Sequence, residues 1–214
     1  MQKQLNSRHS CLGVILAGGL SSRMGQDKAE LVLADNTTLI NAMALRLSLC
    51  DEISDIVLSR NHHQTTSQHQ AEYLVLADQL TEIGPLGGIH AVYHWLDETN
   101  QRNDWDSILF LPVDMPAMSS ELIDVLIRAG RQDKHTVPHY FSTSIMPLYL
   151  PTALDVRQYV EEVVRDNGKR SLKAMTRYFN GVELQEREPE CFINTNTPDE
   201  WQQYCHQAKS ALTN

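Results

Sequence analysis

Residues 16–28 combine the side chains and the backbone freedom that bind phosphate groups. They read Leu-Ala-Gly-Gly-Leu-Ser-Ser-Arg-Met-Gly-Gln-Asp-Lys and follow an apolar run. Glycines adopt positive φ readily and lack a Cβ, so successive backbone N–H groups can turn inward around an anion. Arg23 and Lys28 add positive charge beside them, and the alternative is a Gly-rich turn without a ligand. The glycines predicted to surround the phosphate are Gly18, Gly19 and Gly25.

The spacing within this segment excludes two common nucleotide-binding patterns. The segment contains neither the Walker sequence G-x-x-x-x-G-K-S/T nor the dinucleotide-binding sequence G-x-G-x-x-G. It resembles instead the signature loop of the nucleotidyltransferases, L-A-G/A-G-x-S/G-x-R-M/L-G-x-D/P-K. Its Gly-Gly and Asp-Lys pairs are most similar to those of the molybdenum cofactor guanylyltransferase family.

Three further segments extend the resemblance in the order that the family has. Residues 84–89 resemble its G-P-L-x-G-I/M, residues 112–116 its x-x-D-x-P, and residues 194–200 its N-x-N-T-P-E-E/D. The four segments together span most of the chain. The resemblance implies a Rossmann-like, three-layer α/β nucleotidyltransferase fold with a mostly parallel central sheet.

The distribution of apolar residues independently predicts an α/β fold. Short β-branched or apolar runs alternate with helical patterns, which is typical of a parallel sheet covered by helices. In the second predicted helix, Leu86, Ile89 and Tyr93 recur at helical spacing and should form one buried stripe. The predicted strands are 12–17, 54–59, 73–77 and 106–111, and the predicted helices are 38–50, 86–98 and 119–130.

The pattern changes after about residue 134. We expect strands over 137–140 and 142–150, a helix from Pro151 to about residue 164, and a turn at residues 167–168. This half of the chain should form the wall that faces the second substrate.

The C-terminal helix has the clearest start of all the predicted elements. Thr197 stands at the N-cap, Pro198 at N1 and Glu200 at N3, which completes a capping box. No internal repeat or flexible linker marks a second domain. We therefore expect one nucleotidyltransferase domain over residues 1–214, with residues 1–10 as a flexible lead-in and about 134–200 as the acceptor-side half.

Composition and charge exclude several classes of protein. The formal net charge of −9 argues against a nucleic-acid-binding surface, which would need clustered cations. The four cysteines lie far apart without a C-x-x-C pair, which favours reduced thiols. No apolar run approaches the roughly 18 residues of a membrane span. We therefore expect a cytoplasmic protein that binds neither nucleic acid nor a membrane.

Asp114 follows the predicted strand 106–111, at a place where a metal ion could bridge it to phosphate groups. Ligands of open parallel sheets bind beyond the carboxyl ends of the strands, and residues 16–28 also follow a strand. Mg²⁺ is usually held by one or two carboxylates together with substrate oxygens. Asp114 is therefore predicted to bind Mg²⁺, and the alternative is a turn-forming Asp before a helix capped by Ser119.

Nucleotidyl transfer, the reaction that the resemblance implies, brings two anions together. A phosphate attacks the α-phosphorus of a nucleoside triphosphate, and pyrophosphate leaves. The protein must neutralise charge and align the attack, and it needs no covalent nucleophile. Catalytic roles are therefore predicted for Arg23, Lys28 and Asp114, with the two cations facing the triphosphate; the alternative for the cations is a solvated loop.

The same resemblance implies a set of nucleotide contacts, with two departures from the usual pattern. Ser59 ends the second predicted strand where relatives often have Asn, and Met146 stands where they often have His. The glycines of the second motif permit close backbone approach in the nucleotide cleft. The implied GTP contacts are Leu16, Ala17, Gly18, Gly19, Gly25, Lys28, Ser59, Asp78, Gly84, Gly87 and Asp114.

A basic group in this acidic chain lies on the expected acceptor side. Lys169, Lys173 and Arg177 recur at spacings of four, which predicts a basic stripe on one helix face. A solvated charge run is the alternative. The resemblance places this segment beside the phosphate of a pterin. The implied acceptor contacts are Lys169, Arg170, Asn194 and Asn196.

The predicted function is transfer of GMP from Mg-GTP to molybdenum-loaded molybdopterin with release of pyrophosphate. GTP and molybdopterin would be the substrates, and molybdoenzymes or their chaperones would be transient partners. One alternative is a CTP-dependent cytidylyltransferase or another nucleotidyltransferase with a small acceptor. A nucleotide-binding or cofactor-delivery protein without turnover is an alternative of a different class.

Overall fold

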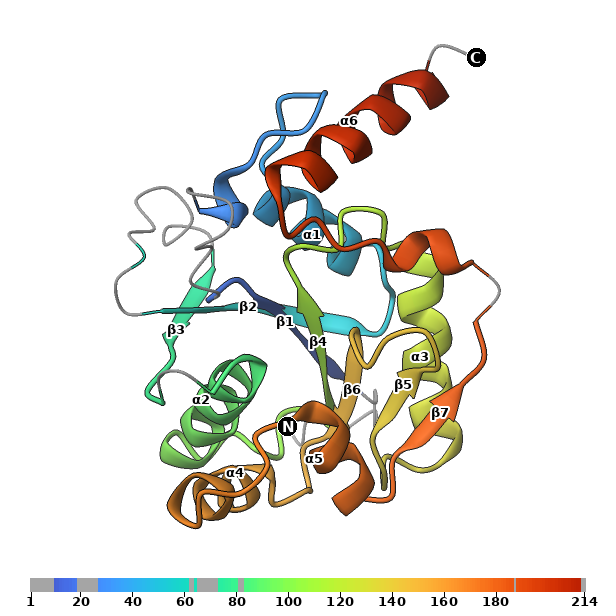
Figure 1. The fold of residues 1–214 in the computed structure, drawn as a ribbon. Coiled ribbons are helices and arrows are strands. Elements are labelled where there is room, and N and C mark those ends of the chain that lie inside the picture. The colour runs from blue at the N-terminus through green and yellow to red at the C-terminus, as the bar shows by residue number, and fades with distance from the viewer. Residues whose placement is uncertain are drawn as a thin grey trace, which may run out of the picture.

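The structure, a computed structural model, describes residues 10–18, 27–61, 64, 73–80, 83–186 and 188–212. Its centre is a seven-stranded sheet in the order β3-β2-β1-β4-β6-β5-β7 (Figure 1). The strands are β1 (Cys11–Leu16), β2 (Ile53–Arg60), β3 (Leu74–Ala77), β4 (Ser107–Pro112), β5 (His139–Phe141), β6 (Leu148–Pro151) and β7 (Val182–Leu184). The α-helices are α1 (Leu39–Ser48), α2 (Pro85–Glu98), α3 (Ser120–Gln132), α4 (Val156–Arg165), α5 (Leu172–Tyr178) and α6 (Pro198–Leu212), and the described 3₁₀ helices are η1 (Lys28–Glu30) and η3 (Pro189–Phe192).

The sheet is mostly parallel. β1 pairs in parallel with β2 on one side and with β4 on the other, and β3 continues the parallel arrangement beyond β2. β6 runs antiparallel to β4 and β5, and β7 is parallel to β5. Leu12, Val14 and Ile15 of β1 are completely buried, as expected for a parallel strand covered on both faces. The predicted α/β class is confirmed.

Helices form a layer on each face of the sheet (Figure 1). α1 and α3 contact each other and the strands on one face, whereas α2 contacts β2 and β3 and packs against α4 on the other. Leu86, Ile89 and Tyr93 are at most 1% exposed, so the predicted stripe of α2 is confirmed. The four strands and three helices predicted before residue 134 all occur, with boundaries within two residues of those expected.

Two of the elements expected after residue 134, the helix from Pro151 and the strand over 142–150, differ from those in the structure. Pro151 ends β6 and does not begin a helix, because it lies opposite Ser107 in the last pair of the ladder, where a missing N–H does not interrupt the sheet. α4 begins five residues later, at Val156. The predicted strand 142–150 is reduced to β6, because the chain bends before it, where Ser144 Oγ accepts a hydrogen bond from the backbone N–H of Met146 at 3.2 Å.

The capping box predicted for the C-terminal helix is confirmed. Glu200 Oε2 accepts from the backbone N–H of Thr197 at 2.9 Å, and Thr197 Oγ1 accepts from the N–H of Glu200 at 3.3 Å. The flexible lead-in expected over residues 1–10 lies, apart from Ser10, outside the described residues. Within the described ranges, no helix combines the length and the apolar character needed to cross a membrane.

Cys11, Cys50 and Cys191 are free thiols, as predicted. Burial raises the pKa of Cys11 and of Cys50 to about 12, so both thiols stay protonated at neutral pH. A protonated, buried thiol is a poor nucleophile and a poor metal ligand. Cys11 and Cys50 therefore contribute to packing, not to chemistry.

Candidate active site

A cavity of about 610 Å³ opens at the carboxyl ends of β1, β2 and β4. The strand order changes direction there, because β2 and β4 lie on opposite sides of β1, and such a switch point is the usual ligand site of an open α/β sheet. Residues of all four sequence motifs line this cavity, which we call the cleft. They include Leu16, Ala17, Gly18, Lys28, Ser59, Asn61, Asp78, Gly84, Gly88, Asp114, Asn194 and Asn196.

Lys28 connects three of the motifs inside the cleft. Its Nζ donates to Asp114 Oδ2 at 3.0 Å and to Asn196 Oδ1 at 2.7 Å. The carbonyl oxygen of Asp114 accepts from the backbone N–H of Thr195 at 2.9 Å, which joins the third motif to the fourth. The structure thus places a cation, a carboxylate and an amide oxygen at one point, although they are far apart in the sequence.

Two local features bring Lys28 and Asp114 to this point. Lys28 is the first residue of η1, and Asp27 caps that turn because its Oδ1 accepts from the backbone N–H of Ala29 at 3.1 Å. Asp114 lies two residues beyond the end of β4, in the connection to α3. Both side chains are mostly buried, with 15% and 22% of their surfaces exposed. Their charges therefore act in an environment where water screens them only partly.

The carboxyl ends of β1, β2 and β3 form a second group of polar contacts. Ser59 Oγ donates to Asp78 Oδ1 at 2.8 Å, and both residues are buried. The backbone N–H of Ala17 donates to the carbonyl oxygen of Ser59 at 2.9 Å. A Cβ at Gly18 would lie only 2.8 Å from Asp78 Oδ2. Glycine at this position therefore allows the Asp78 carboxylate to lie against the start of the phosphate-binding segment.

The glycines of the second motif have different tasks. Gly84 caps α2 with a φ of +62°, a conformation that other residues rarely adopt, and it lines the cleft. A Cβ at Gly88 would collide with Ser59 Oγ, so this glycine lets α2 pack closely on β2. A Cβ at Gly87 would lie 2.8 Å from the carbonyl oxygen of Leu80. Gly87 therefore packs against the backbone before α2, whereas Gly84 and Gly88 face the cleft.

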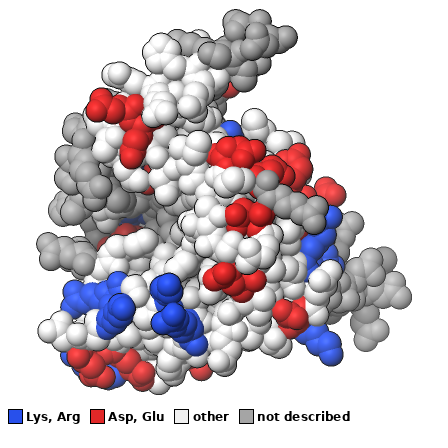
Figure 2. Space-filling view, turned by 45° about the vertical axis from the view of Figure 1, so that its right-hand side comes forward, with Lys and Arg blue, Asp and Glu red and all other residues white. Residues whose placement is uncertain are grey.

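The second wall of the cleft comes from the segment after β5 and from the start of α5. Residues 144–146 and Leu172 line it. Lys169, Arg170 and Lys173 are exposed next to Leu172 in the sequence. Figure 2 shows Lys and Arg side chains gathered beside a hollow on this face of the molecule. An anion that approaches along this wall would meet positive charge.

The predicted basic stripe on a single helix face is wrong. Ser171 caps α5, and its side chain accepts a hydrogen bond from the first turn of that helix at 3.2 Å. Lys169 and Arg170 precede this cap, so they lie outside the helix. Lys173 and Arg177 are the members of the set that α5 carries.

Other predicted site residues fall outside the described residues, and several residues that line the cleft were not predicted to do so. Arg23, Gly19 and Gly25 lie outside the described residues. Among the unpredicted cleft residues is Asn61, which donates from Nδ2 to the carbonyl oxygen of Gly18. Its position directly after β2 could have indicated it, because residues beyond the carboxyl ends of parallel strands face the ligand.

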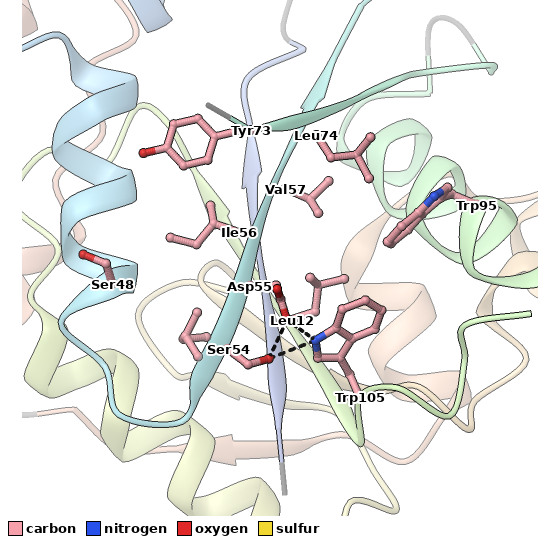
Figure 3. A pocket seen from close by; sticks show the side chains of 11 residues that line it. Leu12, Ser48, Ser54, Asp55, Ile56, Val57, Tyr73, Leu74, Trp95 and Trp105 are labelled. Carbon is pink, nitrogen blue, oxygen red and sulfur yellow. Dashed lines mark hydrogen bonds between the residues drawn. The ribbon is translucent and has the colours of Figure 1, made fainter. Parts of the chain in front are cut away.

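A second cavity, of about 680 Å³, lies at the amino ends of the strands (Figure 3). Aromatic and aliphatic side chains dominate it, and Trp105 Nε1 donates to Ser54 Oγ and Asp55 Oδ2, both at 3.0 Å. Among the described residues that line it there is no Lys or Arg. It therefore lacks the cations that a triphosphate needs, and the cleft is the better candidate for the active site.

The oxygen atoms in the cleft suit a hard divalent cation. Asp114 Oδ2 and Asn196 Oδ1 both contact the Lys28 ammonium, so a positive charge already lies between them. Mg²⁺ prefers such carboxylate and amide oxygens and completes its coordination with water and substrate phosphates. The residues present therefore fit Mg²⁺.

The sequence profile of the MobA-like NTP transferase domain matches residues 13–182, which is most of the chain. The chain belongs to this family. Two relatives named molybdenum cofactor guanylyltransferase are each 30% identical to it. The one from Xanthomonas euvesicatoria pv. vesicatoria aligns over 198 residues, 91% of this chain and 94% of the relative. The one from Photobacterium profundum aligns over 194 residues, 89% and 93% of the two chains.

Comparison with solved structures shows the same fold. The crystal structure of molybdopterin-guanine dinucleotide biosynthesis protein A from Archaeoglobus fulgidus has a TM-score of 0.72 and 18% identity to this chain. The match covers 93% of this chain and 99% of that one. This MobA-like protein is therefore a nucleotidyltransferase of molybdenum cofactor biosynthesis.

Proposed function

We propose that this protein transfers GMP from Mg-GTP to the phosphate of molybdenum-loaded molybdopterin, with pyrophosphate as the second product. The observation that carries the proposal is the contact of Lys28 with both Asp114 and Asn196. This contact brings a cation together with a carboxylate oxygen and an amide oxygen, which are groups that bind Mg²⁺. The cleft that contains them has the volume usual for a small-molecule site. The names of the two relatives support the guanine base and the pterin acceptor.

The residues of the cleft have separate tasks in this reaction. Mg²⁺, held by Asp114 and by the triphosphate, would neutralise charge at the reacting phosphate. Lys28 turns from Asp114 to the phosphates and stabilises the negative charge that develops on the leaving pyrophosphate. Arg23 would supply a second positive charge for the leaving pyrophosphate. The acceptor phosphate forms its bond to the α-phosphorus as the bond to the β-phosphate oxygen breaks, so no covalent enzyme intermediate is needed.

Asp78 supports guanine over cytosine as the base. Its carboxylate lies at the edge of the cleft beside Gly18. Carboxylate oxygens are acceptors only, and guanine presents two adjacent N–H donors on its pairing edge whereas cytosine presents a single amino group. We therefore assign Asp78, held by Ser59, to the recognition of the base.

We expect GTP to bind at least about tenfold more tightly than ATP, CTP or UTP, which corresponds to one good paired contact. Calorimetric titration of the four nucleotides in the presence of Mg²⁺ measures this preference directly. A second titration with Mg²⁺ omitted tests whether the metal takes part in binding. Equal or tighter binding of CTP would assign the protein to the cytidylyltransferases.

We infer that Lys169 and Arg170 guide the phosphate of the acceptor, together with Asn194 and Asn196 inside the cleft. Arg170→Glu should therefore raise the KM for the acceptor while GTP affinity stays within about twofold, because charge reversal acts mainly on the nearest anion across a screened site. Steady-state transfer with varied acceptor at fixed Mg-GTP, alongside a GTP titration, measures both effects.

The matched control for this variant is Arg128→Glu, which reverses an exposed charge on α3, away from the wall formed by α5. The control should leave both constants unchanged. If Arg170→Glu and Arg128→Glu behave alike, the basic group is an ordinary solvated surface and the acceptor phosphate binds elsewhere.

A further inference from the structure

Arg60 is a buried charged residue that the proposed reaction does not use. It ends β2, only 1% of it is exposed, and it is among the largest fully buried side chains of the described chain. Arginine side chains carry a positive charge. Burial of an ion opposes folding unless a partner of opposite charge and hydrogen bonds compensate for the lost water. The contacts of Arg60 therefore indicate what its burial achieves.

The partner of Arg60 is Asp27, the residue directly before Lys28. Arg60 Nη2 donates to Asp27 Oδ2 in an ion pair. The other carboxylate oxygen of Asp27 accepts a hydrogen bond from the backbone N–H of Ala29 at 3.1 Å. The backbone carbonyl oxygen of Asp27 accepts one from the backbone N–H of Glu30 at 3.2 Å. Asp27 thus caps η1 with one oxygen and joins it to β2 with the other.

The residue directly after β2 makes a second contact of this kind. Asn61 Nδ2 donates to the carbonyl oxygen of Gly18, where the chain leaves β1. Arg60 and Asn61, at and directly after the end of β2, therefore hold the predicted phosphate-binding segment at two points, Gly18 near its start and Asp27 near its end. Arg60 has no described hydrogen-bond partner for its Nε and Nη1, so Asp27 supplies its ionic compensation within the described ranges.

We propose that Arg60 is a positioning residue for nucleotidyl transfer, which acts by anchoring the turn that carries Lys28. The ion pair with Asp27 attaches η1 to the rigid end of β2, and Lys28 then reaches Asp114 and Asn196. A displacement of about 1 Å at a reacting group can lower a rate by as much as two orders of magnitude. The inference rests on the proposed role of Lys28, but it does not depend on the base or the acceptor.

The first test is Arg60→Met, which removes the charge and roughly conserves the volume. The Asp27 side chain is 25% exposed, so water can solvate it in this variant and the fold should persist. The nucleotide used is whichever of the four binds wild-type protein most tightly. We expect kcat to fall at least about tenfold and the nucleotide Kd to rise at least about fivefold, with the KM for the acceptor within about twofold of wild type.

Amide hydrogen exchange reports on the anchor without any need for turnover. Exchange over residues 27–31 should be faster in Arg60→Met than in wild type, because the N–H groups of Ala29 and Glu30 lose their fixed cap. The matched control is Arg131→Met, which removes the ion pair with Glu52 at the amino end of β2. This control should change neither exchange over residues 27–31 nor the kinetic constants.

A double variant keeps the proposal testable if Arg60→Met does not fold. Asp27→Asn with Arg60→Met removes both charges, so neither remains buried without a partner. We expect the same losses as for Arg60→Met, because the two residues act through one contact. Unchanged exchange over residues 27–31 together with wild-type kcat in a folded variant overturns the proposal. If the wild-type protein prefers a nucleotide other than GTP, the proposed function is wrong. The role of Arg60 is not affected by that result, because it does not depend on the base.

Discussion

Substitution Asp114→Ala is expected to lower nucleotidyl transfer by at least about two orders of magnitude, or about 3 kcal/mol of transition-state stabilisation. The variant loses the carboxylate that we assign to Mg²⁺ and that contacts Lys28 at 3.0 Å. The fold should persist, because the bond from Thr195 to Asp114 uses backbone atoms. Pyrophosphate release measures the loss, and thermal melting checks the fold.

A matched control for Asp114→Ala is Asp51→Ala, which removes an exposed carboxylate from the turn before β2. This control should keep wild-type turnover. Near-normal pyrophosphate release by Asp114→Ala at saturating Mg²⁺ would remove Asp114 from the active site and leave the metal without its charged ligand.

The second large effect is expected for Lys28→Met. Transfer should fall at least about a hundredfold, because one preorganised cation at a developing negative charge contributes about 3 kcal/mol. The same substitution should raise the affinity for free Mn²⁺ measured without nucleotide, since the ammonium lies 3.0 Å from Asp114 Oδ2 and 2.7 Å from Asn196 Oδ1, where it competes with a metal ion.

In Lys28→Met the transfer rate should fall while the affinity for free Mn²⁺ rises. A general loss of structure would lower both. Mn²⁺ binding can be followed by electron paramagnetic resonance, with Asp114→Ala as the variant that should bind the free metal most weakly. Unchanged Mn²⁺ affinity in Lys28→Met would contradict the placement of metal and ammonium on the same two oxygens.

Much of the fold was predictable because its signals are local. The alternation of apolar runs and helical patterns located β1 to β4 and α1 to α3, and the buried stripe of α2 follows from its helical spacing. Pro151 shows the limit of such signals. Proline is favoured both at the start of a helix and at the end of a ladder, and only the pairing with Ser107 decides between them.

The candidate site was predictable in part for a similar reason. Lys28 and Asp114 follow parallel strands, so their arrival at one edge of the sheet follows from topology. The ion pair of Arg60 with Asp27 depends on tertiary contact, because a charged residue at a strand end is more often exposed. Helical spacing alone extends the helix back to Lys169, because it does not reveal that Ser171 is the N-cap of α5.

We propose that this protein joins GMP to molybdenum-loaded molybdopterin in the cleft that contains Lys28 and Asp114. The most direct measurement incubates the purified protein with Mg-GTP and that acceptor, then determines pyrophosphate and the mass of the pterin. We expect one pyrophosphate for each pterin whose mass increases by that of a GMP group, and loss of both products in Asp114→Ala. Bound GTP with no pyrophosphate and an unchanged pterin would contradict it.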